Sequence, residues 1–257
     1  MSLIGLTLRQ ARFDNKAFWR NPAAAFFTFV FPLMFLLIFN LVFPSGEVEV
    51  EGGLIDTSTF YVPGILALSV INACFTGISQ TVAFNRDKGV LKRLRGTPMP
   101  PIAFFLGRVL QTVFVTILLV IIVMAVGAVA FGVEIQTDKL PAMAVALVVG
   151  AAAFCALGLA MSGFIPNADS GPAVVNAVIL PLLFISDVFI PMQDAPQWLR
   201  DFASLFPVSH LSRAMHEAYN PLTAGSGFEV KSLVMMTAWG VVGLALAVRY
   251  FSWEPRK

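Results

Sequence analysis

Residues 86–95 carry a dense group of charges between two long apolar runs of the sequence. The charged side chains are Arg86, Asp87, Lys88, Lys92, Arg93 and Arg95. Ammonium and guanidinium groups bind carboxylates and phosphates, and they are too costly to bury in a bilayer. The segment must therefore lie outside the membrane, where its chemistry suits it to binding an acidic surface.

The same segment has an apolar side, which predicts a short helix. Val90, Leu91 and Leu94 would share one helical face, with the cations around them. Gly96 and Pro98 are expected to end this helix, because glycine accepts a left-handed cap and proline cannot continue the backbone bonding. An amphipathic helix held beside the membrane is typical of protein docking. The predicted contact residues are Arg86, Asp87, Lys88, Gly89, Leu91, Lys92, Arg93, Leu94 and Arg95.

Sequence motifs for catalysis are missing from the chain. It has no GxxxxGK[ST] loop to hold nucleotide phosphates, no HExxH zinc motif, no CxxC and no nucleophile elbow. We therefore assign no catalytic residue, and the chain is not expected to hydrolyse ATP through such a loop.

Few other side chains could do chemistry. Cys74 and Cys155 fall inside apolar runs and are expected to be inert packing residues. His210 and His216 do not share a helical face, so no metal site is expected. Asp187 is the only charged residue within the predicted spans, and it lies near the end of one. Pumps driven by protons or sodium bury such groups at mid-membrane, so a secondary transporter is disfavoured.

The composition predicts a membrane protein. Charged residues make up 12% of the chain, apolar residues 58%, and the mean hydropathy is +0.81. A soluble domain would carry about twice that charge. Stretches long enough to cross a bilayer as helices cover residues 23–43, 60–84, 109–131, 141–165, 172–190 and 233–248. The predicted fold is all-α, a polytopic membrane protein with six transmembrane helices in a single domain, 1–257.

The distribution of charge predicts the orientation. If the amino terminus is inside, six spans place most Lys and Arg residues, and few acids, on the cytoplasmic side. Both termini would then be cytoplasmic. The basic residues are interpreted as membrane-side anchors, and nucleic acid is not expected as a partner.

Residues 1–22 are predicted to form a cytoplasmic amphipathic helix at the membrane interface. Its basic stripe consists of Arg9, Arg12, Lys16 and Arg20, and the roughly opposite face contains Leu3, Ile4, Ala11 and Phe18. Such a helix rests its apolar face among acyl chains and its basic face near lipid phosphates. A topology anchor and a protein-docking element are both open interpretations.

The loops on the far side differ in length. Residues 44–59 are acidic and small, and residues 132–140 read as a turn. The loop 191–232 is long and contains two amphipathic stretches, 195–206 and 208–219. Two short helices before the last span predict a re-entrant helical hairpin that dips into the outer leaflet.

Three parts of the sequence carry a recognisable pattern. The first is RDKGVLKRLRGTPM at 86–99, and the second is FWRNP at 18–22 followed by FVFP at 29–32. The third combines ISDVFIP at 185–191, APQWL at 195–199 and FPVSH at 206–210. In this order they resemble the loop between the second and third helices, the entry into the first helix, and the last outer loop of ABC type-2 transporter permeases. Those permeases are the membrane subunits of six-helix (type V) ATP-binding-cassette exporters, including the daunorubicin-resistance type.

The resemblance implies a division of labour in the membrane of a bacterial cell. A separate cytoplasmic ABC ATPase would bind residues 85–103 as the coupling loop, with the amino-terminal helix beside it and residues 167–171 as a minor contact. ATP and Mg would be held by that partner, and this chain would carry no cofactor. A second permease chain would complete the transporter, as a homodimer or a heterodimer, among membrane lipids.

Asp187 departs from the family pattern, which usually has glycine at this place. A carboxylate near the exit could select cationic substrates or close the path against Arg200 or Arg213, and a solvated helix end is the alternative. The residues grouped as an outer gate are Asp187, Arg200, His210, Arg213 and Glu217.

The polar groups within the spans are scattered: Asn72, Thr76, Ser79, Gln80 and Asn176. Without a charged lining, they favour export of an amphipathic, drug-like or lipid-like substrate. A lipid-linked glycan is the nearest alternative. From other classes, a membrane-embedded enzyme and a purely structural subunit are the rivals.

Overall fold

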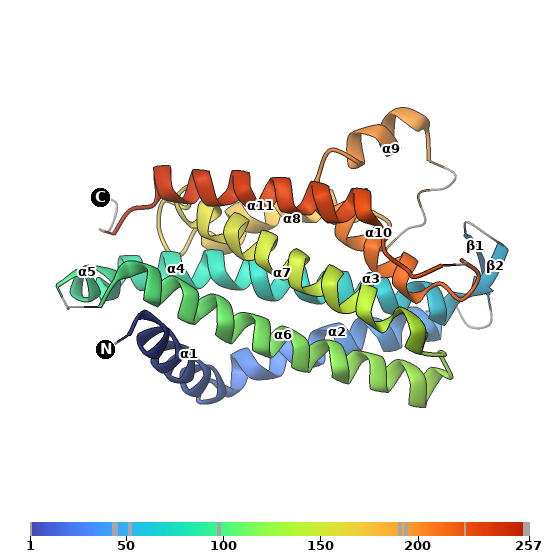
Figure 1. The fold of residues 1–257 in the computed structure, drawn as a ribbon, viewed down its shortest axis with the longest axis horizontal. Helices are drawn as coiled ribbons and strands as arrows, with labels where there is room; N and C mark the ends of the chain where they lie inside the picture. Colours follow the sequence, from blue (N-terminus) through green and yellow to red (C-terminus); the bar gives the residue numbers. More distant parts are fainter. Residues whose placement is uncertain are drawn as a thin grey trace.

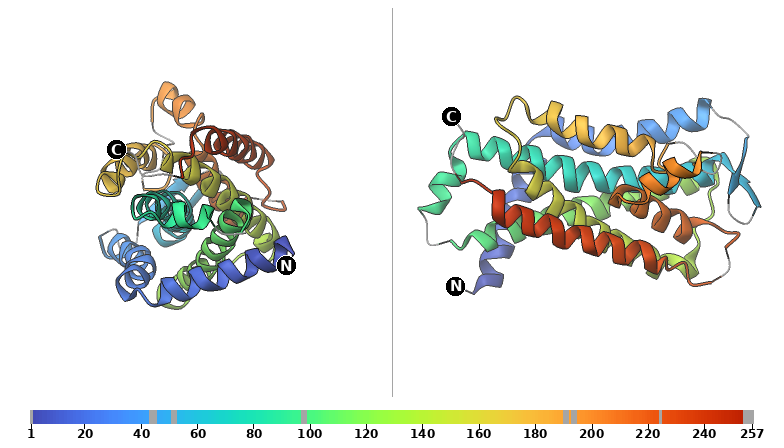
Figure 2. Two further views of the ribbon diagram at one scale, coloured as in Figure 1. Left: turned by 90° about the vertical axis from the view of Figure 1, so that its left-hand side faces the viewer. Right: turned by 90° about the horizontal axis from the view of Figure 1, so that it is seen from above.

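The computed structural model describes residues 2–42, 46–50, 53–96, 99–189, 192, 195–223 and 225–253. Over these residues the chain is a bundle of long helices lying roughly side by side, with a small hairpin at one end (Figures 1 and 2). Five segments in the described part are long and apolar enough to cross a membrane. They are α2 (Pro22–Val42), the continuous segment α3 (Thr57–Ile71), η1 (Asn72–Thr76) and α4 (Gly77–Asp87), α6 (Pro101–Phe131), α7 (Leu140–Ser162) with the short turn before it, and α11 (Val230–Tyr250).

These segments confirm long apolar helices at five of the six predicted spans. The stretch predicted over 172–190 is helical only in α8 (Gly171–Phe184), and its 14 residues rise about 21 Å at 1.5 Å per residue. The chain turns at residues 185–187, where Asp187 has a φ of 55° that a helix cannot contain. Ile190 lies outside the described residues, so a sixth crossing stays a prediction.

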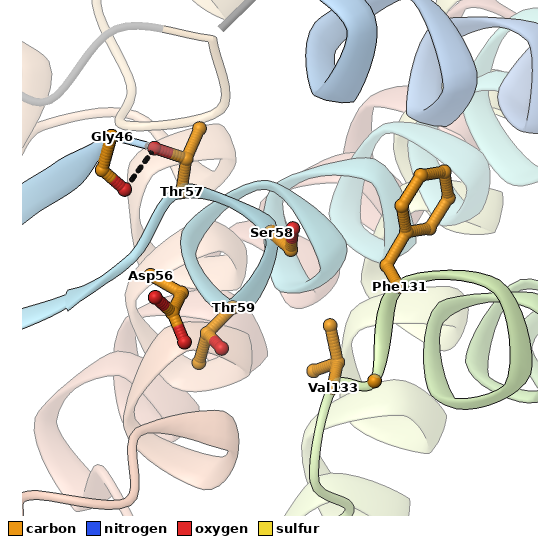
Figure 3. Close-up of a pocket in the computed structure, with 8 residues that line it drawn as sticks. Gly46, Asp56, Thr57, Ser58, Thr59, Phe131 and Val133 are labelled. Carbon is orange, nitrogen blue, oxygen red and sulfur yellow. Dashed lines mark hydrogen bonds between the residues drawn. The ribbon is translucent and has the colours of Figure 1, made fainter. Parts of the chain in front are cut away.

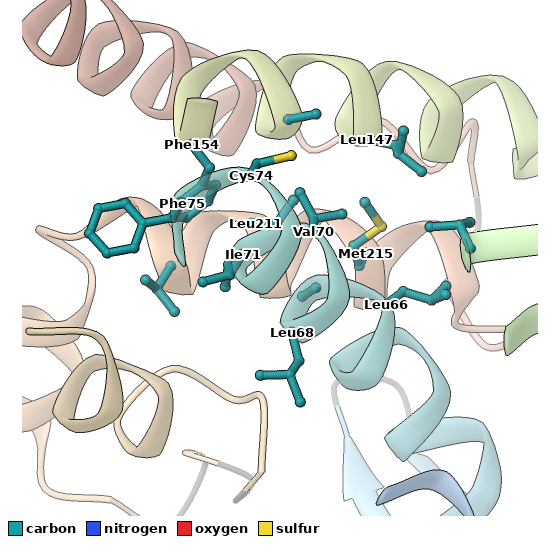
Figure 4. Close-up of a cluster of buried hydrophobic side chains, with 14 of the residues drawn as sticks. Leu66, Leu68, Val70, Ile71, Cys74, Phe75, Leu147, Phe154, Leu211 and Met215 are labelled. Atoms are coloured by element: carbon teal, nitrogen blue, oxygen red, sulfur yellow. The ribbon is translucent and has the colours of Figure 1, made fainter. Parts of the chain in front are cut away.

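The segment from Thr57 to Asp87 is the centre of the bundle. Its most apolar window is 78% buried, against 17% for α2 and 22% for α11. Figure 4 shows side chains of this segment packed against α7 and α10 (Pro207–Tyr219), with Phe75, Phe154 and Leu211 among them. Helices α2, α6, α7 and α10 therefore pack directly on this central span, whereas α11 packs on α7 and α10.

The middle of this span is a π-helical turn, η1, where a regular helix was predicted. Its widened backbone is approached closely by α7 at Gly158. A Cβ at Gly158 would lie 2.8 Å from the carbonyl oxygens of both Cys74 and Phe75. Only glycine permits this approach, because every other residue would place a carbon against the two oxygens.

The two ends of the bundle differ in character (Figure 1). We call the end that holds α1 (Leu3–Trp19), α5 (Val90–Arg95) and the connection 163–170 the basic end. The opposite end holds β1 (Glu47–Val50), β2 (Gly53–Asp56), η2 (Thr137–Lys139) and residues 220–223 and 225–229, and we call it the hairpin end.

The hairpin is the exception to the all-α fold that was predicted. β1 and β2 pair antiparallel from Glu47 opposite Asp56 to Val50 opposite Gly53. The hydroxyl of Thr57 donates to the carbonyl of Gly46 at 2.6 Å, which fastens the hairpin to the start of α3. The acidic loop predicted here is thus partly ordered by strand pairing.

The long loop 191–232 contains the two short helices that were predicted. They are α9 (Gln197–Ala203) and α10, whereas residues 191, 193, 194 and 224 of the loop lie outside the described part. α10 is mostly buried against α3, α7 and α11, but α9 projects from the bundle with Trp198 68% exposed. Insertion of this pair into a membrane leaflet stays a prediction.

Candidate functional site

The predicted docking segment is two helices joined by a turn. α4 ends at Asp87, Lys88 and Gly89 form the turn, and α5 follows. The prediction of one helix that presents Arg86 and Lys88 beside Leu91 is therefore wrong. Gly89 has a φ of 68°, a left-handed conformation that interrupts the helix and favours glycine.

The left-handed glycine was predicted at the wrong position. Gly96 ends α5 with a φ of −80°, which is right-handed. The second predicted helix terminator, Pro98, lies outside the described residues.

α5 turns its leucines toward the protein and exposes Lys92 and Arg93. Leu91 is fully buried and Leu94 partly buried, so the predicted apolar face packs against the protein itself. Lys92 and Arg93 are exposed, as is Lys88 in the turn before them. Arg95 is the last residue of the helix. The candidate docking surface is therefore the set Lys88, Lys92 and Arg93.

Arg86 does not belong to that surface, which corrects its predicted role as a surface contact. Its side chain is 2% exposed and points into the bundle from the end of α4. The guanidinium donates to the carbonyls of Ser162 at 3.0 Å, Ile165 at 2.8 Å and Pro166 at 3.1 Å. It was missed because its partners lie far along the chain, at the end of α7.

Asp87 faces the same connection. One carboxylate oxygen accepts from Nε of Arg86 at 3.2 Å, and the other accepts from the backbone N–H of Ala168 at 2.6 Å. Its side chain is 23% exposed. Asp87 is thus bonded within the protein, where contact with a partner was predicted.

α1 confirms a helix in the amino-terminal segment, but its contacts differ from those predicted. It lies along α6 and approaches it closely at Gly107, where a Cβ would be 2.6 Å from that of Gln10. Asp14 is buried in this contact, and its Oδ1 lies 3.5 Å from Nη2 of Arg108. The stripe of Arg9, Arg12, Lys16 and Arg20 is exposed, as predicted. Placement of α1 at a membrane interface stays a prediction.

The predicted outer gate is brought together only in part. Nε of Arg213 on α10 lies 4.0 Å from Oδ2 of Asp187, and the backbone N–H of Met192 donates to Oδ1 at 2.7 Å. Asp187 has a positive φ, a conformation that glycine adopts most readily and that aspartate tolerates. Its carboxylate holds the backbone of Met192.

The other three members are spread out. Arg200 is exposed on α9, and Glu217 is partly exposed on α10. His210 is buried: its Nε2 lies 2.9 Å from the carbonyl of Ser204 and its Nδ1 3.2 Å from the hydroxyl of Ser232. It joins α9 to α11 rather than lining a gate.

His216 was not predicted as part of this region, yet it lies beside it. Its Nδ1 is 2.8 Å from the carbonyl of Ser212, its Nε2 is 3.1 Å from the carbonyl of Phe60, and the Phe60 ring is 4.8 Å away. Burial lowers the pKa of His216, and the carboxylate of Asp187 opposes this shift. His216 thus connects α10 to the start of the central span.

Lys139 is a second buried cation that sequence reasoning missed. It is 3% exposed, and its Nζ donates to the carbonyls of Asn220 and Thr223, both at 2.7 Å, and to the Thr223 hydroxyl at 2.9 Å. It closes the end of α10, where backbone carbonyls have no helical partner. A lone lysine in a predicted turn gave no signal of this role.

A cavity of about 250 Å³ opens at the hairpin end (Figure 3). Its lining comes from the start of α3 and the end of α6, and consists of Gly46, Asp56, Thr57, Ser58, Thr59, Phe131, Gly132 and Val133. Sites for drug-sized ligands occupy about 300–1,000 Å³. This cavity is therefore too small to hold the predicted cargo within a single chain.

Comparison with known proteins identifies the family. The sequence profile of the ABC-2 type transporter family matches residues 8–219. The chain is 30% identical to the daunorubicin resistance ABC transporter permease protein of Streptomyces coeruleorubidus, over 89% of this chain and 78% of that one. It is 23% identical to a protein of Pyropia yezoensis whose name describes a transport permease, over 88% of this chain and 76% of the other.

A third relative, from Escherichia coli strain K12, is named as a multidrug ABC transporter permease. It is 22% identical over 64% of this chain and 45% of that protein. The chain belongs to the ABC-2 type transporter family of membrane permeases.

Proposed function

We propose that this chain is the membrane subunit of an ABC exporter whose ATP, with Mg, is hydrolysed on a separate subunit bound at α5. The observation that carries the proposal is the division of α5 into a buried side and an exposed cationic side. Leu91 anchors the helix with no exposed surface, while Lys92 and Arg93 are left free to meet carboxylates. A rigidly packed, charged surface is suited to receive force from a partner.

The orientation follows from the same charges. The basic end would lie in the cytoplasm, where an ATPase is available, and the hairpin end outside. Both chain termini would then be cytoplasmic, in a multi-pass protein of the bacterial plasma membrane. The exposed cations of α1 would contact lipid phosphates or the same ATPase.

The cargo path is assigned to one side of the central span. Asn72 and Gln80 are partly exposed, although most of the span is buried, and α8, whose first residue Gly171 lies close to Gln80, carries the exposed Asn176. A second permease chain would face this side and complete the path. Sparse, uncharged polar groups suit an amphipathic drug-like or lipid-like substrate, which agrees with the drug-resistance names of two relatives.

The test is association with an ATPase. The full chain is purified in mild detergent with the ABC ATPases of its host, each identified by mass spectrometry, and ATP hydrolysis is assayed. A Lys92→Glu, Arg93→Glu double variant should lose the ATPase, because it reverses both exposed cations of α5. The matched control is Lys231→Glu with Arg200→Glu, which reverses two exposed cations at the hairpin end.

The control should bind as the wild type does. If the wild-type chain binds no ATPase, or if the α5 variant binds one as well as the control, the proposal is wrong. The first transport assay is the uptake of daunorubicin by inverted vesicles, because the name of one relative refers to resistance to this drug.

A further inference from the structure

The strongest buried polar cluster at the basic end joins three helices. The guanidinium of Arg86 donates to carbonyls of Ser162, Ile165 and Pro166 at 2.8–3.1 Å. These carbonyls lie at and just beyond the end of α7, where a helix leaves carbonyls without intrahelical partners. Arginine is suited to this task, since its planar group offers five donors in a fixed fork.

Asp87 extends the cluster to α8. Its carboxylate accepts from the N–H of Ala168, three residues before α8 begins at Gly171, and also from Nε of Arg86. Two adjacent residues of α4 therefore hold both sides of the connection 163–170. Arg86 fixes its departure from α7, and Asp87 fixes its approach to α8.

The same two residues are one short turn away from α5. Only Lys88 and Gly89 separate Asp87 from the start of α5, and the turn is closed by backbone bonds from Lys88 to Phe84 and from Gly89 to Arg86. A displacement of α5 must therefore act on the residue pair that holds α7 and α8. The exposed cations receive the partner, and the buried pair lies behind them.

We propose that Arg86 and Asp87 form a transmission clamp, which passes movement of α5 to α7 and α8 without contacting the ATPase. The inference rests on the proposed function and adds to it a division between docking residues and positioning residues. Lys92 and Arg93 determine whether the ATPase binds. Arg86 and Asp87 determine whether its ATP cycle reaches the transmembrane helices.

The test is hydrogen exchange of the full chain bound to its ATPase, measured with and without ATP plus vanadate. Wild type should show an ATP-dependent change in exchange over residues 163–170 and the start of α8. Arg86→Gln, Arg86→Lys and Asp87→Asn should bind the ATPase as wild type does but lose that change. Arg249→Gln, which removes an exposed arginine of α11 outside the docking surface, is the matched control and should keep it.

The clamp also has a signature in the chain alone. In Arg86→Gln and Asp87→Asn, exchange of the Ala168 amide should rise by about tenfold, because a hydrogen bond to a charged acceptor protects it. Arg86→Lys keeps the positive charge but loses the planar guanidinium. If the geometry of the guanidinium holds the three carbonyls, exchange of the Ala168 amide in Arg86→Lys should rise as it does in Arg86→Gln.

Several outcomes would overturn the inference. Arg86→Lys or Asp87→Asn could keep the ATP-dependent change, which would show that the clamp transmits nothing. Folded Arg86 variants could lose the ATPase as the α5 variant does, which would make Arg86 a docking residue. If Arg86→Gln fails to fold, the inference is tested by the ATP-dependent change in exchange of Arg86→Lys and Asp87→Asn. A wild-type chain that binds no ATPase contradicts the proposed function and the transmission role together, whereas exchange at Ala168 still reports the contacts.

Discussion

The basic end and the hairpin end hold their helices by the same device. At each, a buried cation from one segment donates to backbone carbonyls where a distant helix ends. Arg86 closes α7 at the basic end, and Lys139 closes α10 at the hairpin end. In both cases the cation satisfies orphan carbonyls that would otherwise be buried without a partner.

The difference lies in what each cation is attached to. Arg86 is backed by Asp87 and is joined through a two-residue turn to α5, whose cations are exposed. Lys139 belongs to a short turn, and α9, which projects from the bundle near that end, presents Trp198 and Phe202 together with one cation, Arg200, and one acid, Asp201. The comparison suggests that one device serves two purposes, transmission at the basic end and fastening at the hairpin end.

The largest effect is expected from a substitution in the middle of the bundle, because it should destabilise the packing of helices that reach both ends. Gly158→Val would place a Cβ 2.8 Å from two carbonyl oxygens of η1 and force α7 away from the central span. We expect a loss of about 3 kcal/mol of stability or more, measured by thermal unfolding in detergent. Ala152→Val, on an exposed part of the same helix, is the control and should be nearly neutral. Equal losses in both variants would contradict this account of η1.

The next effect should be confined to the hairpin end. Lys139→Met removes the donor for two carbonyls and a hydroxyl, and we expect a loss of about 2–3 kcal/mol. ATPase binding should be unchanged, because α5 is not touched. Lys231→Met removes an exposed lysine at the same end and should have little effect on either measurement. Loss of ATPase binding in a folded Lys139→Met protein would erase the distinction between the ends.

A smaller effect is expected at Asp187, where backbone and side chain can be separated. Asp187→Asn should leave stability nearly unchanged, because asparagine tolerates a φ of 55° and can still accept from Met192. Asp187→Ala should cost about 1–2 kcal/mol. If the carboxylate also gates the exit through Arg213, Asp187→Asn should alter the transport of a cationic substrate relative to a neutral one at unchanged stability. Equal transport by the wild type and Asp187→Asn would show that Asp187 only fixes the backbone conformation and does not gate the exit.

The smallest effect is a pH dependence that belongs to the hairpin end alone. The chain has two histidines, both on α10, and burial lowers the pKa of each. The unfolded chain therefore takes up protons more readily than the folded one, so stability is full above about pH 6.5 and falls as the pH drops below it. Thermal unfolding at pH 7.5 and 5.5 should show this decrease. Replacing both histidines by glutamine should flatten it, and an unchanged slope would contradict the assignment.

Local patterns predicted most of the elements. Long apolar runs predicted the spans, because the length of a bilayer-crossing helix is a property of the run itself. The amphipathic stretches 195–206 and 208–219 predicted α9 and α10 for a similar reason. The predicted boundaries were wrong where tertiary contacts extend or shorten a helix, as in α6, which begins at Pro101 rather than near Val109.

The candidate site was predicted as a segment but not in its internal arrangement. Its five cations cannot be told apart in the sequence, yet Arg86 is buried and Lys92 is exposed. The partners of Arg86 are 76 to 80 residues away along the chain. No local sequence pattern predicts which helix end packs beside its side chain. The π-helical turn was missed too, because the glycine that fits it belongs to another helix.

The sequence by itself determined the class of protein, the number of long apolar runs and the place of the basic loop, because hydropathy and charge are sums over neighbouring residues. Only the tertiary structure decided which cations remain free for a partner and which ones close a helix. That choice depends on where unpaired carbonyls at distant helix ends come to lie, and a buried guanidinium or ammonium group is stable only beside them.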